Sequence, residues 1–346
     1  MSSNAFQWTF PFLFIRGHMF KRACSSVTHL KSTLSLSVVQ AVRRSLQPIN
    51  NKFQHTYIST MSYKAVERGS KFTDNYRVYF EGPSGACSPW HDIPLYADQA
   101  NNVFNMVVEI PRWTYAKMEM NTTGKLNYIK QDVKKGKLRF VGNVFPHHGY
   151  IWNYGAFPQT WENPRTTDKH TSATGDNDPL DVCEIGDKVH PIGSIIQVKV
   201  LGIMAMIDEG ETDWKVLVID VNDPLAEQMN DVEDIERLKP GLLKATYEWF
   251  VLYKIPDGKP KNSFAFNGEA KNKDFALKII SEMAAQWREL VMSEPSFANL
   301  CGASVSVENS PQQITQGEAD SELSSSASPG PAASLPEGLD KINYVS

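Results

Sequence analysis

The stretch Ile195-Ile-Gln-Val-Lys-Val-Leu-Gly-Ile-Met-Ala-Met-Ile207 gives the clearest fold signal in the chain, and Trp214-Lys-Val-Leu-Val-Ile-Asp-Val221 follows it after a short acidic linker. Both runs are rich in β-branched and other apolar residues, which favours strands. The linker, Asp208-Glu-Gly-Glu-Thr-Asp213, places Gly210 where a tight turn is needed. The stretch therefore predicts a long β-hairpin.

Strand signals dominate on both sides of this hairpin, and helix signals are fewer and come later. Asp274 is expected to cap a helix in which an apolar residue recurs every four positions from 275 to 287, and residues 242–253 predict another helix. This order predicts a mainly β fold of the α+β class, a compact barrel or sheet with outer α-helices. The other strands are expected over 76–80, 105–110 and 138–144.

Composition excludes several classes of protein. With 346 residues, 41% of them hydrophobic and 21% charged, the chain suits one large globular domain or two small ones. The net charge of −4 disfavours nucleic acid as a partner, and no apolar run approaches the roughly 20 residues that membrane insertion needs. The four cysteines form no CxxC pair, which disfavours a disulfide framework or a zinc site and fits a reducing compartment.

The N-terminal end is basic and free of acids. Residues 1–66 hold many Arg, Lys, Ser and Thr residues but neither Asp nor Glu, as is typical of organelle transit peptides. We expect a mitochondrial (matrix) transit peptide or disordered extension over 1–60. A secretory signal is disfavoured because the basic residues follow the apolar patch at 10–15, whereas a disordered cytosolic tail stays open. A start at Met61 would give a shorter, cytoplasmic product.

The C-terminal end is polar. From about Ala303 the sequence is rich in Ser, Pro and Gly, and such a segment buries little apolar surface to offset its ordering entropy. We therefore expect a globular domain over 61–302 and a flexible polar tail over 303–346.

The acidic stretch Gly175-Asp-Asn-Asp-Pro-Leu-Asp181 carries three carboxylates within six residues. Pro179 disfavours a regular helix here, and acids on a stiff loop can converge on a hard divalent cation such as Mg²⁺. An EF-hand is disfavoured because Asp181 stands where that loop needs Gly. A metal site and a plain solvated acidic loop both stay open on this stretch alone.

Further charged residues share strand faces with one another. Asp213 and Lys215 are two apart on one predicted strand, as are Lys117 and Glu119 on another. Arg139 stands between apolar neighbours, and Tyr253-Lys254 ends an aromatic stretch. Arg, Lys and Tyr are donors suited to phosphate oxygens, although surface charges or ion pairs would explain each of them singly. Together they predict a site for a metal-bound polyphosphate.

Five motifs carry a resemblance to a known family. They are Gly175-Asp-Asn-Asp-Pro-Leu-Asp-Val, Ile207-Asp-Glu-Gly-Glu-Thr-Asp-Trp-Lys, Val144-Phe-Pro-His-His-Gly-Tyr-Ile-Trp-Asn-Tyr, Phe250-Val-Leu-Tyr-Lys-Ile-Pro-Asp-Gly-Lys-Pro and Phe264-Ala-Phe-Asn-Gly-Glu-Ala-Lys. These motifs, which follow one another along the chain in the family's order, resemble the signatures of the family I soluble inorganic pyrophosphatases. The likeness runs from about residue 63 to residue 291 and is closest to the animal and fungal branch. With its N-terminal extension, the chain is similar to the mitochondrial members.

The resemblance implies a five-stranded OB-like β-barrel, a homodimer, and Mg²⁺-dependent hydrolysis of inorganic pyrophosphate, with several Mg²⁺ ions per site. It implies a base at Asp178 that acts on the attacking water. It also implies tight metal ligands at Asp176, Asp181 and Asp213, ligands of substrate-borne metals at Asp208 and Glu119, phosphate-binding groups at Lys117, Arg139, Lys215, Tyr253 and Lys254, and cavity residues at Glu109, Tyr150 and Tyr154.

Three other functions are weighed against this one. OB-like barrels also serve as binding or assembly modules without catalytic activity, but nucleic acid would need a basic groove rather than a carboxylate-rich one. A pseudoenzyme subunit would be favoured by the loss of a metal-binding Asp, and none is lost. Another metal-dependent phosphohydrolase is the nearest enzymatic alternative.

Overall fold

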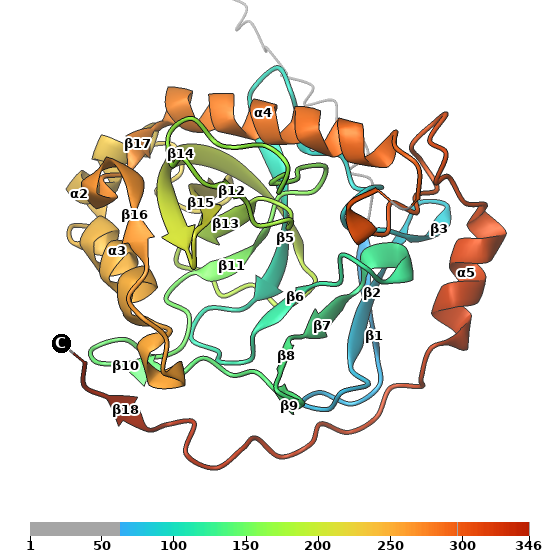
Figure 1. Ribbon diagram of the computed structural model, residues 1–346, viewed down its shortest axis with the longest axis horizontal. Coiled ribbons are helices and arrows are strands. Elements are labelled where there is room, and N and C mark those ends of the chain that lie inside the picture. The colour runs from blue at the N-terminus through green and yellow to red at the C-terminus, as the bar shows by residue number, and fades with distance from the viewer. Residues whose placement is uncertain (1–62, 296, 346) are drawn as a thin grey trace, which may run out of the picture. The chain divides into compact units, whose positions relative to one another are not determined.

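The computed structural model describes residues 63–295 and 297–345, so the predicted transit peptide and the start at Met61 lie outside the described residues. Five strands form a closed ring at the centre, in the order β15, β13, β11, β5 and β14, and β14 pairs again with β15 (Figure 1). This ring confirms the mainly β fold with an OB-like core. Its strands are β5 Val103–Ile110, β11 Asn153–Ala156, β13 Asp181–Glu184, β14 Ile195–Asp208 and β15 Glu211–Asp220.

A second sheet stands beside the ring, in the order β1, β2, β7 and β6, with β3 paired to β2. The strands outside the ring are β1 Lys64–Arg68, β2 Arg77–Gly82, β3 Gly85–Cys87, β4 Tyr96–Asp98, β6 Met118–Met120, β7 Ile129–Gln131, β8 Val133–Lys134, β9 Lys137–Leu138, β10 Asn143–Val144, β12 Thr174–Gly175, β16 Ser263–Phe264, β17 Lys271–Asn272 and β18 Ile342–Asn343. The helices are α2 Val232–Leu238, α3 Leu242–Leu252, α4 Lys273–Val291 and α5 Gln316–Ser325.

The β14–β15 hairpin is formed as the sequence predicts. Asp208 pairs with Glu211, so Glu209 and Gly210 form a two-residue loop, with φ angles of 49° and 98°. Positive φ at both positions is the geometry of the tight turns that match strand twist. The register shifts near Gly202, where a Cβ would lie 2.6 Å from the Lys271 carbonyl oxygen. Only glycine lets β17 approach β14 so closely.

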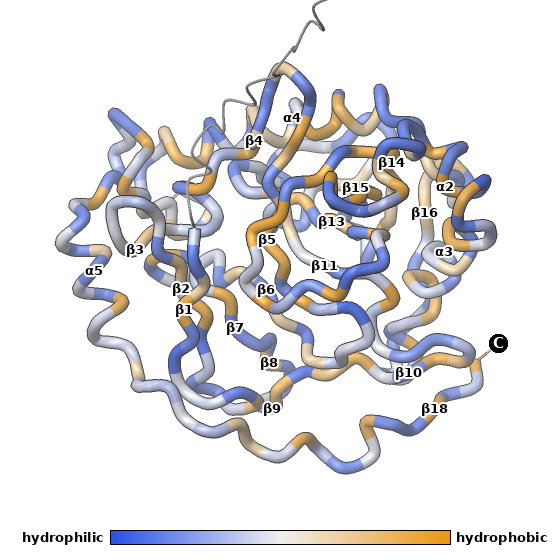
Figure 2. Tube along the Cα trace, turned by 180° about the vertical axis from the view of Figure 1, so that it is seen from behind, coloured by the Kyte–Doolittle hydropathy of each residue, from blue (hydrophilic) through white to orange (hydrophobic). Residues whose placement is uncertain are grey.

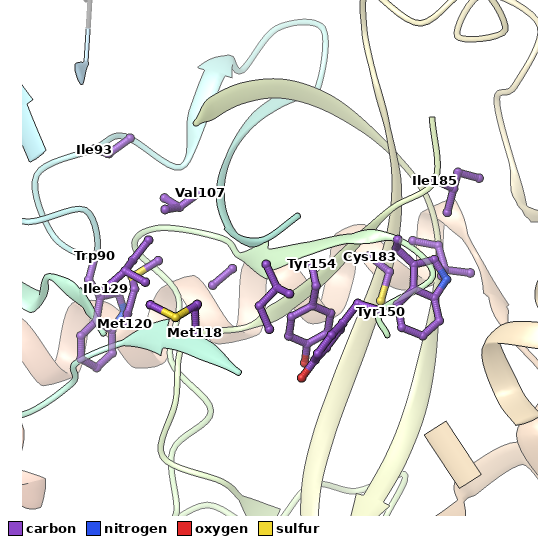
Figure 3. Close-up of a cluster of buried hydrophobic side chains, with 14 of the residues drawn as sticks. Trp90, Ile93, Val107, Met118, Met120, Ile129, Tyr150, Tyr154, Cys183 and Ile185 are labelled. Carbon is purple, nitrogen blue, oxygen red and sulfur yellow. The ribbon is translucent and has the colours of Figure 1, made fainter. Parts of the chain in front are cut away.

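Alternate residues of β15 pack on opposite faces. Trp214, Val216 and Val218 join the cluster that includes Ile279 and Met283 of α4, whereas Leu217 and Ile219 join the other large cluster. This period of two places Lys215 on the same face as Leu217 and Ile219. Figure 3 shows part of that second cluster, in which the rings of Tyr150 and Tyr154 lie against each other with centroids 5.3 Å apart.

The helices follow the sequence closely, with one correction. Helix α3 ends at Leu252 within the predicted 242–253, and α4 has the predicted apolar spacing, with buried Ile279, Met283 and Trp287. The cap of α4 is Asn272 rather than Asp274, because the Asn272 side chain accepts a hydrogen bond from the Phe275 N–H. Asp274 lies in the first turn, where an acid favours the positive end of the helix dipole.

The strand predicted over 138–144 is interrupted. Only its ends are strands, β9 and β10, and between them Phe140 makes an isolated bridge with Ala116. The backbone pairs irregularly here, since the Val141 N–H donates to the Tyr115 carbonyl while the Arg139 carbonyl accepts from the Lys117 N–H. The apolar run 138–144 is therefore an irregular connection rather than a continuous strand, and Arg139 lies within it.

The C-terminal segment, for which composition predicts a flexible tail, contains helix α5 and strand β18. Residues 303–345 include helix α5. After α5 the chain continues along the lower edge of Figure 1 to β18, which pairs with β10. Figure 2 shows this segment as mainly white and blue, in contrast to the orange of β5. Two of its apolar residues are nevertheless buried: Ala319 and Leu323, one turn apart on α5, pack against Tyr79, Ala86 and Leu126.

Two neighbouring residues anchor the start of this segment. The Asp92 carboxylate accepts hydrogen bonds from the Ser304 hydroxyl and from the backbone of residues 305 and 306. Buried His91 accepts a hydrogen bond from the Trp287 indole at Nδ1 and lies 3.0 Å from the Cys301 carbonyl oxygen at Nε2, which fits a neutral ring protonated at Nε2. Burial lowers the pKa of His91 to about 4.

Among the described residues, no helix is long and apolar enough to cross a membrane.

Candidate active site

A polar cavity of about 230 Å³ collects charged residues from the strands of the ring and from neighbouring segments. All fourteen predicted site residues line it, so the structure brings together what was scattered over 146 positions, from 109 to 254. The lining residues are Glu109, Ile110, Lys117, Met118, Glu119, Met120, Arg139, Tyr150, Tyr154, Asp176, Asp178, Pro179, Asp181, Asp208, Glu209, Glu211, Asp213, Lys215, Trp249, Phe250, Tyr253 and Lys254.

The acidic loop is held in shape by hydrogen bonds of its backbone and of its side chains. Asn177 adopts a φ of 75°, its N–H donates to the Glu162 carbonyl, and its side chain accepts from the Trp161 indole. Asparagine tolerates this left-handed conformation better than most residues. The Asp178 N–H donates to the Asp176 carboxylate, 3.1 Å away. These contacts turn Asp176 inward and leave Asp178 exposed at the cavity.

Lys215 is the central cation of the site, with only 1% of its side chain exposed. Its ammonium group contacts the carboxylates of Asp181 and Asp213 and donates to the Tyr154 hydroxyl. Burial alone would lower the pKa of Lys215, but the two carboxylates raise it well above its ordinary value. Lys215 is therefore charged, and it holds β13 and β15 together at the site.

The other cations of the cavity also contact acids. Lys117, which directly precedes β6, pairs with Glu119 within it, and Lys254 pairs with Asp208. Arg139 donates to Asp132, 3.1 Å away, and this acid was not among the predicted site residues. Each phosphate-type donor thus has an acid beside it that orients its charged group.

Acids outnumber cations in this cavity. Nine carboxylates and four cationic side chains line it. Burial, followed by Asp213 and Asp178, raises the pKa of Asp176 well above its ordinary value. The surrounding protein, which displaces water from these carboxyl groups, likewise raises the pKa of Asp178 at the cavity opening and of buried Asp213 to about 7. An excess of convergent carboxylate oxygens with raised pKa values fits a site that divalent cations complete.

The phenols of the cavity stay neutral. Burial raises the pKa of Tyr150, Tyr154 and Tyr253, and the nearby carboxylates raise it further for Tyr154 and Tyr253. The Tyr154 hydroxyl donates to the Asp181 carboxylate. Tyr253 stacks on Trp249, with ring centroids 4.7 Å apart. These rings supply uncharged donors at fixed positions.

Sequence reasoning missed one buried acid, Glu162. One oxygen from each carboxylate of Glu162, Asp176 and Asp213 lies within 4.8 Å of the other two. The only sequence signal at Glu162 was a lone acid between Trp161 and an Asn-Pro pair, which has no periodicity to place it. The pKa of Glu162 is raised well above its ordinary value by burial and by these two acids.

The fold and the site define an acid-rich barrel cavity with fixed cationic and phenolic donors, as a metal-assisted phosphate enzyme requires. Residues 106–288 match the family model described as inorganic pyrophosphatase. The inorganic pyrophosphatase of Candida albicans is 54% identical over 287 residues, which cover 82% of this chain and 98% of that protein. The inorganic pyrophosphatase of Drosophila melanogaster is 51% identical over 284 residues, which cover 82% and 84%.

A solved structure agrees with these relatives. The inorganic pyrophosphatase from Schistosoma japonicum superposes with a TM-score of 0.77 at 48% identity, and the match covers 82% of this chain and 100% of that one. The chain belongs to the inorganic pyrophosphatase family. Membership confirms the resemblance of the five motifs and sets aside the reading of the barrel as a binding module.

Proposed function

We propose that this chain hydrolyses inorganic pyrophosphate to two phosphates and thereby pulls pyrophosphate-releasing biosynthetic reactions forward. The observation that carries the proposal is the single cavity in which nine carboxylates face four cations and three phenols. Family membership supports the same reaction. The excess of acids disfavours a free polyanion as ligand, whereas a metal-bound one offers the charge that the acids lack.

The donors of the cavity would bind the two phosphates. Lys117, Arg139 and Lys254 supply charge, and Tyr253 supplies a neutral donor. Each of the three cations now contacts an acid, so substrate oxygens would share or replace those contacts. Arg139 donates one hydrogen bond to Asp132, which leaves its other guanidinium N–H groups available for substrate oxygens.

Mg²⁺ is the cofactor we propose, with several ions per site. Asp176, Asp181 and Asp213 would hold the tight ions, and Asp208 and Glu119 would bind ions that arrive with substrate. Their hard oxygen donors suit Mg²⁺, and Asp208 Oδ1 is buried without a hydrogen-bond partner among the described residues. Bound Mg²⁺ supplies a water of lowered pKa and neutralises phosphate charge.

Asp178 would be the general base. Its backbone N–H donates to Asp176 and its carbonyl accepts from Glu162, while its carboxylate stays exposed at the cavity. A pKa of about 7 in the metal-free site means that Asp178 can hold a proton near neutral pH, and cations beside it would lower that pKa. In this proposal it would take a proton from the attacking water.

The test is phosphate release from pyrophosphate by the full chain, with Mg²⁺ and with chelator. We expect rapid release only with Mg²⁺, and a loss of about 10²-fold or more in Asp178→Asn. Asp274→Asn, an exposed change in the first turn of α4, is the matched control and should keep full activity. Folded protein that releases no phosphate would refute the proposed reaction, and an active Asp178→Asn would refute the role of Asp178.

We also propose a homodimer, on the basis of the resemblance and of three exposed aromatic residues. Trp113 is 59% exposed, Phe145 57% and Tyr344 77%, and Tyr344 stacks on Phe145. A second copy of the chain would cover these exposed rings. Light scattering should give twice the chain mass for the wild type and a lower mass for Trp113→Ser with Tyr344→Ser. A monomeric wild type would refute the dimer.

For residues 1–60 we propose a mitochondrial transit peptide, ahead of a pyrophosphatase domain that begins near residue 61. The support is the acid-free, basic and Ser-rich composition of this end. A fluorescent protein fused to residues 1–60 should enter the matrix, and a chain started at Met61 should stay in the cytoplasm. A fusion that stays cytoplasmic would refute the targeting proposal.

A further inference from the structure

Glu162 connects the two segments that carry the metal-type acids. Its backbone N–H donates to the Asp178 carbonyl, 3.0 Å away, and its carbonyl accepts from the Asn177 N–H at 2.9 Å. Its side chain reaches the other segment, since Oε1 accepts from the Trp214 N–H at 3.1 Å. One residue therefore fixes the acidic loop by its backbone and the foot of β15 by its carboxylate.

The contact with the acidic loop is close. A Cβ on Gly175 would lie 2.4 Å from the backbone carbonyl carbon and oxygen of Glu162, so only glycine allows the two backbones to meet. Asp176 follows directly on Gly175, and Asp213 directly precedes Trp214. The position of Glu162 thus sets the separation between the Asp176 and Asp213 carboxylates.

The two oxygens of Glu162 have different surroundings. Oε1 accepts a hydrogen bond from the Trp214 N–H. Oε2 is buried without a hydrogen-bond partner in the described part of the chain. The side chain has 1% exposure and borders a second cavity as well as the acids. Leaving an ionised carboxylate oxygen buried and unpartnered is costly, which favours a cation or a hydrogen-bond donor beside it.

Glu184 is a buried acid whose carboxylate oxygens are hydrogen-bonded entirely within the protein, and it serves as a comparison for Glu162. It is fully buried, its Oε1 accepts from the Gly186 and Asp220 N–H groups, and its Oε2 accepts from the Asn153 amide. Both oxygens are satisfied by the chain itself. Glu162 differs because Oε2 has no donor among the described residues, and because its carboxylate lies near Asp176 and Asp213, which are acceptors too when ionised.

We propose that Glu162 is a positioning residue for the divalent cation held by Asp176 and Asp213. Its backbone and Oε1 keep these two acids at the separation that the cation needs, and Oε2 adds an acceptor beside them. The inference rests on the proposed metal dependence and adds a residue that does not itself touch the substrate. Residues that orient metal ligands typically change metal affinity by about 10–100-fold when they are replaced.

The test compares Glu162→Gln with the wild type and with Glu184→Gln in the full chain. Titration with Mn²⁺ followed by electron paramagnetic resonance gives the cation affinity, and thermal melting with chelator and with Mg²⁺ gives the stability gained from cation. The amide of Gln keeps an acceptor for the Trp214 N–H and can donate to Asp176 or Asp213. We therefore expect Glu162→Gln to melt in chelator at or above the wild-type temperature, to bind Mn²⁺ at least about 10-fold more weakly, and to gain less from Mg²⁺.

Glu184→Gln should instead lose stability equally in chelator and in Mg²⁺ and keep its Mn²⁺ affinity. Glu162→Asp, which keeps the charge but shortens the side chain, should bind Mn²⁺ with intermediate affinity and gives a second reading if the Gln variant does not fold. Wild-type Mn²⁺ affinity in Glu162→Gln, or an equal loss of stability with and without cation, would overturn the inference alone. A wild-type chain that takes up no Mn²⁺ would overturn the metal dependence on which it rests.

Discussion

Replacing Lys215 by methionine removes the central cation of the site while keeping a side chain of similar length. Two carboxylates, Asp181 and Asp213, then face each other without a cation, and Tyr154 loses a donor. Removing one partner of a buried ion pair costs about 3–5 kcal/mol. Asp213 is 8% exposed but Asp181 is 21% exposed and keeps some water, so we expect about 3–4 kcal/mol. At about 2–4 °C per kcal/mol, the melting temperature should fall by about 6–16 °C.

The assay is urea denaturation of the full chain in chelator at pH 8. Lys169→Met is the matched control, because Lys169 pairs with Glu282 at the surface, where the two side chains are 60% and 38% exposed. Such exposed pairs contribute at most about 1 kcal/mol. At pH 5 part of the Lys215→Met deficit should disappear: Asp213 already has a pKa of about 7 beside Lys215, and without the ammonium it takes up a proton more readily. A deficit no larger than that of Lys169→Met would refute the role of Lys215.

Three further predictions concern other parts of the structure. Burial lowers the pKa of His91 to about 4. Between pH 6.5 and pH 4 the unfolded chain therefore binds a proton at His91, whereas the folded chain does not. Wild-type stability relative to His91→Gln should therefore fall by about 3 kcal/mol between pH 7 and pH 4 in urea titrations, and a constant difference would contradict this. Gly175→Ala should displace the acidic loop from Glu162 and lower phosphate release by at least about 10-fold, because its Cβ cannot fit beside the Glu162 backbone; full activity would show that the loop tolerates the shift. Leu323→Ala should cost about 2–3 kcal/mol and expose residues 303–345 to protease, and unchanged cleavage would show that α5 is held by other contacts.

The regular strands and the set of charged residues could be predicted because both have short-range signals. The β14–β15 hairpin is long, apolar and interrupted by one glycine turn, and its alternation places Asp213 and Lys215 on one face. The acids of the 175–181 loop stand close together in sequence, so their convergence needed only a stiff loop.

Glu162 and the C-terminal segment could not be predicted in the same way. The role of Glu162 depends on a close approach to Gly175, 13 positions away, within irregular chain. The segment after residue 303 is polar overall, and average composition hides the few positions that matter. Thr315 and Glu318 form a capping box at the start of α5, and this pattern is visible in the sequence as Thr-x-x-Glu.

The C-terminal segment has a consequence for how the protein opens. Its contacts with the rest of the structure include a buried carboxylate at Asp92, two apolar side chains of α5 and the short pairing of β18 with β10. None of these contacts lies within the closed ring of strands. Amide hydrogen exchange should therefore occur in two tiers, with residues 303–345 exchanging through a local detachment that leaves the ring protected. The ring amides would exchange only when the whole domain unfolds.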